Sequence, residues 1–346
     1  PCRVEPAHAS RAESNATRNG STLESRTSAA RVPPHSGFVA FTGRKLAFQY
    51  SPHGYPMSAN STSQRHLARC LSFATHLERG PMLRMLSSIA IVVVAIYLAL
   101  CVLLFLMQRQ MLYLPHYTRV ATAATDFELV SDGLKLRGWR VNPGQPRALL
   151  YFGGNAEEIG YQRERFAAWF PSHTIYLLAY RGYGASEGSP AEAALKGDAL
   201  ALYDAIAPRH AGVDALGRSV GSGVALHVGA RRALGRLALI TPYDSLVAVA
   251  SHHYPLFPVN WLLRERFDAA ADAANVHVPT LLLLARQDEI IPPVHAEALA
   301  RAFPQPPALQ WLDTDHNTTE VDANFALALQ RHFRAGSTAT DASATR

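Results

Sequence analysis

The stretch that decides the fold is VDALGRSVGSGVAL at Val213–Leu226, and at its centre stands Gly217-Arg218-Ser219-Val220-Gly221. A G-x-S-x-G pattern between a strand and a helix is typical of a nucleophile elbow, a strained turn that exposes a serine hydroxyl. The residues before the pattern form a short, mostly apolar run, and small and apolar residues follow it. We therefore predict that Ser219 is a catalytic nucleophile between a buried strand and a closely packed helix.

The sequence contains a second match to the same pattern, Gly184-Ala185-Ser186-Glu187-Gly188. Its flanks do not fit an elbow, because Arg181-Gly182-Tyr183 before it has the composition of a loop. Gly188 and Pro190 also delay any helix after it. Ser186 is therefore predicted to lie in a structural turn.

Outward from the elbow, short apolar runs alternate with helical stretches. This alternation predicts an α/β fold with a mostly parallel sheet covered by helices on both faces. A hairpin around Ser131-Asp132-Gly133 precedes the alternation. The predicted strands are Phe127–Val130, Leu134–Val141, Ala148–Phe152, Thr174–Ala179, Ala215–Leu216 with its flanks, Leu237–Thr241, Thr280–Ala285 and Ala308–Leu312, and the predicted helices are Glu157–Phe170, Pro190–Ile206, Val220–Arg232, Val294–Phe303 and Glu320–Phe333.

Two backbone N–H groups are candidates for an oxyanion hole. The helix after Ser219 begins at Val220, and its free N–H groups and positive dipole end favour developing negative charge. The second donor is expected in the loop after the third strand, Gly153-Gly154-Asn155, and we assign it to the Asn155 N–H. Gly154 would let the backbone approach the substrate closely, unless the glycines serve only the turn.

An acid and a base follow Ser219 in the order that such elbows require. Asp288 comes directly after the strand ending at Ala285, and His316 follows the strand ending at Leu312. Because the carboxyl ends of parallel strands lie at one edge of a sheet, we expect Asp288 to orient His316 beside Ser219.

Other acids and histidines are rivals. Asp244 follows the strand ending at Thr241 and is the alternative acid, while Glu289 is expected to point elsewhere on its turn. His295 at a helix start and His227 within the helix after the elbow are predicted to be ordinary surface or packing histidines.

The segment Tyr243–Ala274 is predicted to be a short, cap-like insertion within a catalytic domain spanning residues 110–335. Its aromatic and apolar residues could line an acyl pocket, with Tyr254 and Trp261 touching the substrate. They could equally pack a helix against the core.

The run Met85–Met107 contains no charged residue and is long enough to cross a bilayer as a helix. We predict an uncleaved single-pass anchor. Arg79 and Arg84 before it, against Arg109 after it, favour a cytoplasmic N-terminus. The catalytic domain would then face the non-cytoplasmic side, which is the periplasm in a bacterium.

The flanks of the chain carry little pattern. Residues 1–80 are rich in Ser, Thr, Ala, Arg and Pro and are interpreted as disordered, or as an artefactual extension ahead of a native start near Met82. A targeting leader ranks behind both interpretations. Residues 336–346 are predicted to be a disordered tail.

Composition limits the classes of function. The 346-residue chain has a formal net charge of +6, and residues 1–80 hold 10 basic and 4 acidic residues. The rest carries 23 of each sign, so a nucleic-acid-binding face is not indicated. The chain has three cysteines, Cys2, Cys70 and Cys101, and the spacing of its His and Cys residues indicates no zinc site.

Several stretches together carry a likeness to a known family: Tyr151–Glu157, Tyr180–Gly188, Gly217–Gly223, Pro279–Asp288 with Ile291-Pro292, and His316-Asn317. On these stretches the chain, from about Gln108 to Phe333, resembles α/β-hydrolase-domain proteins, especially a membrane-anchored branch related to eukaryotic depalmitoylases and lysophospholipases. The resemblance implies a Ser219–Asp288–His316 triad, no metal, no organic cofactor, and a tyrosine-rich loop at 180–184 as architecture near the pocket. The chain departs from the family at Gly153, where histidine is usual, and at residues 285–287, where a glycine is usual.

These observations predict a serine hydrolase that cleaves esters or thioesters of small-molecule, lipid-like or acylated substrates through an acyl-enzyme. A serine peptidase of the prolyl-aminopeptidase kind is the alternative from the same fold. A non-catalytic binding module is a more remote alternative. The sequence makes no prediction of oligomeric state.

Overall fold

The computed structural model of the chain describes residues 80–334. The interpretations of residues 1–79 as disorder, extension or leader, and of residues 336–346 as a tail, fall outside the described residues.

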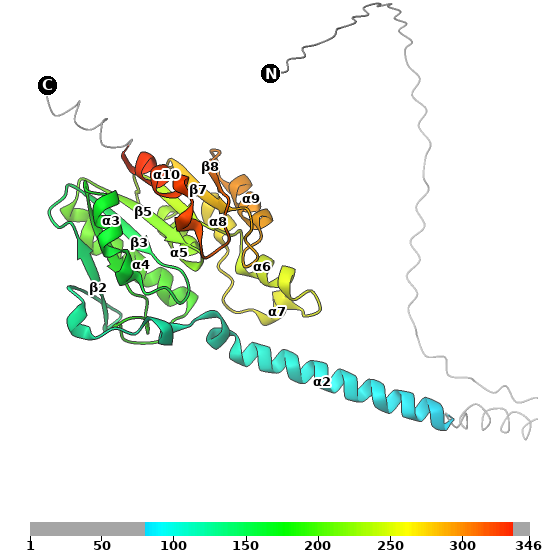
Figure 1. The fold of residues 1–346 in the computed structure, drawn as a ribbon. Coiled ribbons are helices and arrows are strands. Elements are labelled where there is room, and N and C mark those ends of the chain that lie inside the picture. The colour runs from blue at the N-terminus through cyan, green and yellow to red at the C-terminus, as the bar shows by residue number, and fades with distance from the viewer. Residues whose placement is uncertain (1–79, 335–346) are drawn as a thin grey trace, which may run out of the picture. The chain divides into compact units, whose positions relative to one another are not determined.

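An eight-stranded sheet forms the centre of the fold (Figure 1), in the order β1-β2-β4-β3-β5-β6-β7-β8. The β1–β2 and β2–β4 pairs are antiparallel, and every pair from β4 to β8 is parallel. The predicted α/β fold with a mostly parallel sheet is therefore confirmed. The strands are β1 (Phe127–Ser131), β2 (Leu134–Val141), β3 (Arg147–Phe152), β4 (His173–Leu178), β5 (Gly212–Arg218), β6 (Leu237–Ile240), β7 (Thr280–Ala285) and β8 (Ala308–Leu312).

The burial of the strands explains why their sequences read as apolar runs. Every residue of β4, β6 and β7 is buried, as expected of parallel strands covered on both faces. The edge strands β1 and β8 contain exposed positions. Periodicity therefore locates the inner strands well, because both of their faces are apolar.

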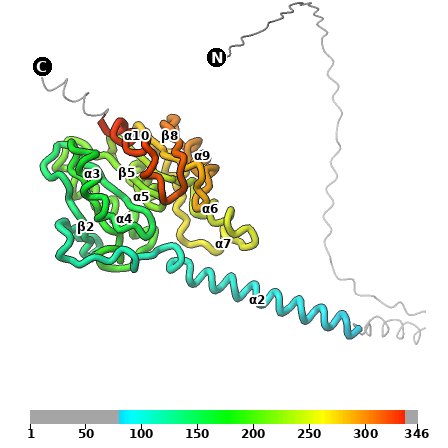
Figure 2. Tube along the Cα trace, in the orientation of Figure 1, coloured from blue at the N-terminus to red at the C-terminus, as the bar shows by residue number. Residues whose placement is uncertain are grey.

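The connections place helices on both faces of the sheet (Figure 2). The crossover from β3 through α3 to β4 runs in one direction, and those through α4, α5 and α9 run in the other. Because parallel crossovers are right-handed, opposite directions put their helices on opposite faces. On one face, α4, α5, α8 and α9 pack in series, and on the other α10 joins α3. The helices are α3 (Arg163–Trp169), α4 (Glu192–Ile206), α5 (Val220–Gly229), α8 (Ala269–Ala273), α9 (Pro293–Ala302) and α10 (Ala323–Arg334).

Three predicted helices need correction at their ends. The predicted helix at 157–170 is a 3₁₀ turn at Ile159–Gln162 followed by α3, because the Glu158 carboxylate caps the turn at the Gly160 N–H. The predicted helix at 320–333 is likewise split, since the Asp322 side chain accepts from the Asn324 N–H and starts α10. The helix after the elbow ends at Gly229 rather than at residue 232.

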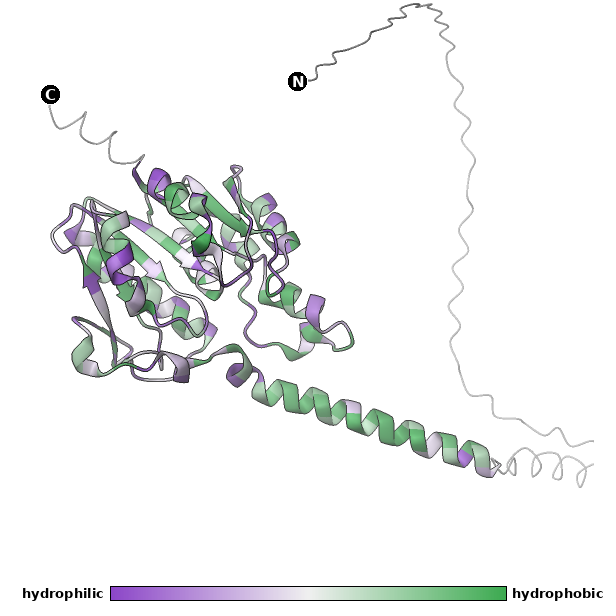
Figure 3. Cartoon of the chain, viewed as in Figure 1, coloured by the Kyte–Doolittle hydropathy of each residue, from purple (hydrophilic) through white to green (hydrophobic). Residues whose placement is uncertain are grey.

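The apolar run near residue 85 forms α2 (Pro81–Leu112), a helix of 32 residues (Figure 3). It is longer than the predicted 85–107 segment because Pro81 begins it, and Gln108–Leu112 continue it to the α/β domain. Gln108 donates to the Leu262 carbonyl, and its own carbonyl group accepts from the Arg264 N–H. Within residues 80–334, α2 is the one helix long and apolar enough to cross a membrane, judged by length and composition.

The insertion between β6 and β7 is built from short helices. After Tyr243 come α6 (Leu246–His253) and α7 (Val259–Leu262), and α8 leads back to β7. The Ser245 side chain caps α6 by accepting from the Ala248 N–H.

His332 on α10 makes the stability of the fold sensitive to acid. Its Nε2 lies 2.9 Å from the Leu237 carbonyl oxygen, and burial, together with nearby Arg236, lowers the pKa of His332 to about 4. The unfolded chain binds this proton near pH 6.5. Above pH 6.5 neither state binds the proton, whereas between pH 6.5 and 4 only the unfolded state does. We therefore expect protonation of His332 in the unfolded chain to lower the free energy of unfolding at pH 4 by about 2–3 kcal/mol relative to its value above pH 6.5.

Urea unfolding of detergent-solubilised wild type and His332→Gln at pH 7 and pH 4.5 tests this expectation. The amide can still donate to the Leu237 carbonyl but does not titrate, so the variant should lose less stability on acidification. Equal losses in the two proteins would contradict the assignment to His332.

Candidate active site

The site lies where the sheet reverses its winding direction. The chain leaves β3 toward β4 and returns to place β5 on the other side of β3, which makes the β3–β5 edge a topological switch point. The last residue of β3, Phe152, pairs with Gly217 near the end of β5. The loop after β3 and the turn after β5 therefore begin side by side, which is why residues 153–155 lie next to Ser219.

Ser219 occupies a strained backbone position. Its φ of 51° and ψ of −121° are unfavourable for a side chain with a Cβ, and strain of this kind persists where the surrounding fold imposes it. The elbow closes tightly against β3, since a Cβ at Gly221 would lie 2.1 Å from the Phe152 carbonyl oxygen. Glycine is therefore needed at 221 for α5 to start directly after the serine.

Ser219, His316 and Asp288 come together in the order that the sequence predicts. The Ser219 Oγ lies 3.0 Å from His316 Nε2, and His316 Nδ1 lies 2.7 Å from Asp288 Oδ2. The other oxygen of Asp288 accepts from the backbone N–H groups of Ile290 and Ile291. Because a carboxylate can only accept, the imidazole proton is on Nδ1, and Nε2 is free to take the proton of the serine.

The turn that carries His316 is itself held rigidly. The Asp315 carboxylate accepts from the N–H groups of Asn317 and Thr318. The Thr318 hydroxyl, followed by these backbone bonds, lowers the pKa of Asp315. His316 and Asp288 are both buried, which keeps water from competing for their hydrogen bond.

The rival residues lie in other hydrogen-bond networks. Asp244 contacts His295, at 2.9 Å between Oδ1 and Nδ1, and His227 contacts Asp272 at 3.1 Å. Glu289 is exposed. The Ser186 hydroxyl accepts from the Arg137 N–H and donates to the Ala179 carbonyl, joining β2 to the end of β4.

A cavity of about 400 Å³ opens at Ser219 and His316. It is lined mainly by the loop after β3, with Leu114 and Ile290 as apolar walls. Within residues 80–334, neither the Val220 N–H nor the Asn155 N–H donates to a protein acceptor. Both candidate oxyanion donors therefore have N–H groups that a substrate oxygen could use.

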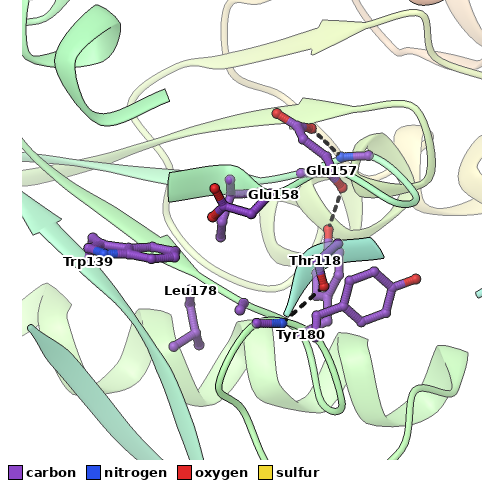
Figure 4. Close-up of a pocket in the computed structure, with 12 residues that line it drawn as sticks. Thr118, Trp139, Glu157, Glu158, Leu178 and Tyr180 are labelled. Atoms are coloured by element: carbon purple, nitrogen blue, oxygen red, sulfur yellow. Dashed lines mark hydrogen bonds between the residues drawn. The ribbon is translucent and has the colours of Figure 1, made fainter. Parts of the chain in front are cut away.

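Sequence reasoning missed the groups that hold the loop after β3. The Glu157 carboxylate accepts from the Gly154 N–H, the Tyr151 hydroxyl and the Gln162 amide. The only feature of the sequence that marks Glu157 is its position five residues after the end of a strand, close to two glycines. Figure 4 shows Glu157 and Tyr180 at the back of this loop, around a cavity of about 10 Å³ that holds no more than one water molecule.

Two tyrosines reinforce the same loop. The Tyr180 hydroxyl donates to the Gly153 carbonyl, and the Tyr183 hydroxyl donates to the Asn155 side chain at 2.9 Å. Burial raises the pKa of Tyr183 to about 12, so this hydroxyl remains a donor at neutral pH. The resemblance implied that the tyrosine-rich loop is architecture near the pocket, and these contacts show how the tyrosines hold it.

Replacing Glu157 with alanine leaves the Gly154 N–H and the Tyr151 hydroxyl without their acceptor, while Gln162 keeps its bond to Glu320, and we expect a loss of about 2–4 kcal/mol in unfolding free energy. Because the loop that carries the Asn155 N–H would shift, kcat should also fall about 10- to 100-fold at nearly unchanged KM. The matched control is Glu158→Ala, which removes only the cap at Gly160. Equal kcat losses in the two variants would argue against a positioning role for Glu157.

The three residues predicted to bind substrate do not lie together. Gly154 lines the cavity at Ser219, whereas Tyr254 lines a different cavity, between α2 and the α6–α7 segment. Trp261 is 87% exposed and lines neither cavity. The insertion folds toward α2 at this point, so these aromatic residues lie away from the triad.

No group of three or more His, Cys, Asp or Glu side chains in the part of the chain that the structure describes could hold a metal ion. The chemistry that the described residues offer at this site is nucleophilic attack by a base-activated serine.

Comparison with known proteins agrees with this fold. No family model matches the chain. An uncharacterized protein of Mycobacterium tuberculosis is 29% identical over 214 residues, which are 58% of this chain and 76% of that protein. The α/β hydrolase domain-containing protein WAV2 of Arabidopsis thaliana is 27% identical over 193 residues, covering 49% of this chain and 63% of WAV2.

An uncharacterized membrane protein of Saccharomyces cerevisiae is 28% identical over 193 residues, covering 51% of this chain and 66% of that protein. Among solved structures, an α/β hydrolase of Vibrio vulnificus superposes with a TM-score of 0.50 at 16% identity, covering 60% of this chain and 79% of that one. The chain has the α/β-hydrolase fold, and its sequence is similar to WAV2 and to the other relatives named above.

Proposed function

We propose that the protein is a serine hydrolase that cleaves carboxylic ester or thioester bonds of lipid-like or acylated substrates. Ser219 attacks the acyl carbon while His316 takes its proton at Nε2, and Asp288 holds the imidazole and stabilises its positive charge. The N–H groups of Val220 and Asn155 stabilise the oxyanion. His316 then protonates the leaving group. In the second half of the reaction His316 takes a proton from water, the water oxygen attacks the acyl carbon, and His316 gives the proton to the Ser219 oxygen as the acyl group leaves.

The observation that carries the proposal is the continuous chain of hydrogen bonds from Ser219 through His316 to Asp288. Three groups from the ends of three different strands meet at hydrogen-bond distance. Such an arrangement has no evident structural purpose at an exposed cavity. The strained φ of Ser219 also supports a catalytic role for this serine, since strain of this kind is kept at functional sites.

The substrate class is inferred from the surroundings of the site. We propose that α2 is a membrane anchor, which keeps the cavity close to lipids and to acylated proteins; the Saccharomyces cerevisiae relative is named a membrane protein. A peptidase acting on a free amino terminus would need a spare carboxylate in the cavity. The acidic side chain lining it, Glu157, is already committed to three donors.

Substrate profiling of the detergent-solubilised protein tests the substrate class. We expect turnover of p-nitrophenyl esters and acyl thioesters, with rates that depend on acyl-chain length, and little turnover of aminoacyl p-nitroanilides. Preferential cleavage of the anilides would favour the peptidase alternative. A folded protein inert toward all three classes would refute the proposed function.

A further inference from the structure

The insertion contains an apolar segment that the catalytic site does not use, Tyr254–Leu263, here called the cap loop. Its sequence, YPLFPVNWLL, contains no charged residue, and Arg264 follows it. Leu256 is 81% exposed and Trp261 is 87% exposed. Large apolar side chains that are this exposed and this close together mark an interaction surface.

The cap loop lies against the middle of α2. The Tyr97 hydroxyl on α2 donates to the Leu256 carbonyl at 2.9 Å, and the ring of Tyr97 stacks on Phe257 with centroids 5.8 Å apart. Nearer the catalytic domain, Gln108 bonds both the Leu262 carbonyl and the Arg264 N–H. The two segments are therefore fixed to each other at both ends of the cap loop.

A second group of contacts, made by charged and polar side chains, joins α2 to the residues that follow the cap loop. The buried Glu265 carboxylate pairs with Arg109 at 2.7 Å and accepts from the Tyr113 hydroxyl. Arg264 also lies over the ring of Phe105, 3.9 Å from its centroid. The charged groups therefore gather where α2 meets the catalytic domain, and the apolar cap loop extends away from them along α2.

The depth of the cap loop in a bilayer follows from its contacts with Tyr97 and from the position of Tyr97 along α2. At about 1.5 Å per residue, roughly 18 Å of helix separates Tyr97 from Arg109 and roughly 20 Å separates it from Arg84. A hydrocarbon core of about 30 Å that leaves both arginines outside holds Tyr97 roughly 10 Å or more below either surface. Leu256 and Phe257, which contact Tyr97, must then lie at the same depth.

The backbone of the cap loop is suited to a dry environment, where unpaired polar groups are costly. Pro255 and Pro258 have no N–H to satisfy. The N–H groups of Phe257, Val259 and Trp261 donate to carbonyls within the loop, and Tyr97 satisfies the carbonyl of Leu256. Among the remaining N–H groups of the loop, those of Leu256 and Asn260 have no protein acceptor within residues 80–334.

We propose that the cap loop is a second membrane-inserted element, which enters the bilayer alongside α2 and contacts lipid acyl chains; this rests on the proposed membrane anchor. An apolar cavity of about 250 Å³ between α2 and the cap loop, lined by residues including Leu104, Met111, Tyr254 and Phe257, lies nearer the Arg109 end of α2. Because Leu256 and Phe257 lie at the depth of the hydrocarbon core, we expect lipid acyl chains to cover the cap loop.

Site-directed fluorescence quenching tests the proposal in proteoliposomes of the full chain. Cys2, Cys70 and Cys101 are replaced, and a bimane label is attached to Leu256→Cys, Trp261→Cys, Val94→Cys or Leu327→Cys. Val94 on α2 serves as the anchor control. Leu327 is exposed on α10, which Figure 1 shows well away from α2 and α7, and serves as the aqueous control. Phosphatidylcholine with nitroxide groups on its acyl chains is the quencher, and circular dichroism checks that each variant folds.

We expect nitroxide lipid to quench the Val94 and Leu256 labels at least several-fold more strongly than the Leu327 label, and to quench the Trp261 label, which lies nearer Arg109, to an intermediate extent. Quenching at Val94 without quenching at Leu256 and Trp261 would overturn the insertion and leave the anchor intact. No quenching at Val94 would overturn insertion and anchor together. Fluorophosphonate labelling reports separately on the hydrolase.

Discussion

The Ser219→Ala variant is expected to lose ester hydrolysis by about 10⁵-fold or more. The expectation follows from the geometry, because the Ser219 Oγ is the atom that His316 Nε2 contacts at 3.0 Å. Without that oxygen no acyl-enzyme forms, and the activity left would come from the oxyanion donors and substrate binding alone. The measurement is kcat for a p-nitrophenyl ester, corrected for the fraction of folded protein.

Ser186→Ala is the matched control, since Ser186 lies in the second G-x-S-x-G sequence. Its hydroxyl bonds backbone groups of Arg137 and Ala179, so the variant should lose about 1–3 kcal/mol of stability. Its kcat per folded molecule should stay within about threefold of wild type, because no such bond reaches the triad. A large loss of kcat in Ser186→Ala, with Ser219→Ala active, would reverse the assignment.

Replacing Asp288 with asparagine should lower kcat by about 10⁴-fold. The Asp288 oxygen that faces His316 Nδ1 at 2.7 Å fixes the imidazole with its proton on Nδ1. An amide nitrogen at that position favours the other tautomer, so Nε2 could no longer accept the serine proton. The two bonds from Ile290 and Ile291 to the other oxygen can persist, which keeps the loop in place.

Asp244→Asn is the control for the acid. Asp244 also contacts a histidine, but that histidine is His295, which bonds neither Ser219 nor Asp288. Its kcat should change by no more than about threefold, because neither Asp244 nor His295 bonds a residue of the triad. If instead Asp244→Asn lost more activity than Asp288→Asn, the acid would have been misassigned.

The strands and the order of the triad could be predicted because they depend on local patterns. β4, β6 and β7 are buried on both faces and read as apolar runs, and the strand–Ser219–helix context separates the elbow from Ser186. Helix ends were predicted less well. Single side-chain caps, from Glu158 and Asp322, decide where a 3₁₀ turn stops and an α-helix begins.

Features that depend on how distant segments dock could not be predicted. Tyr254 was expected near the substrate, yet the insertion docks on α2 through contacts such as Tyr97 to Leu256, which are far apart in sequence. The role of Glu157 was missed for the same reason. Its three donors come from a strand, a turn and a 3₁₀ turn, and no sequence spacing shows that they converge on one carboxylate.

The central claim, that Ser219 is the nucleophile, is tested most directly by mapping a covalent adduct. The wild-type protein is treated with a fluorophosphonate, digested with trypsin and analysed by mass spectrometry. Cleavage after Arg218 and Arg231 releases Ser219–Arg231, whereas Ser186 falls in Gly182–Lys196. We predict a single adduct, on Ser219, with fragment ions that exclude Ser222. An adduct on Ser186, or no adduct on a folded protein, would contradict the claim.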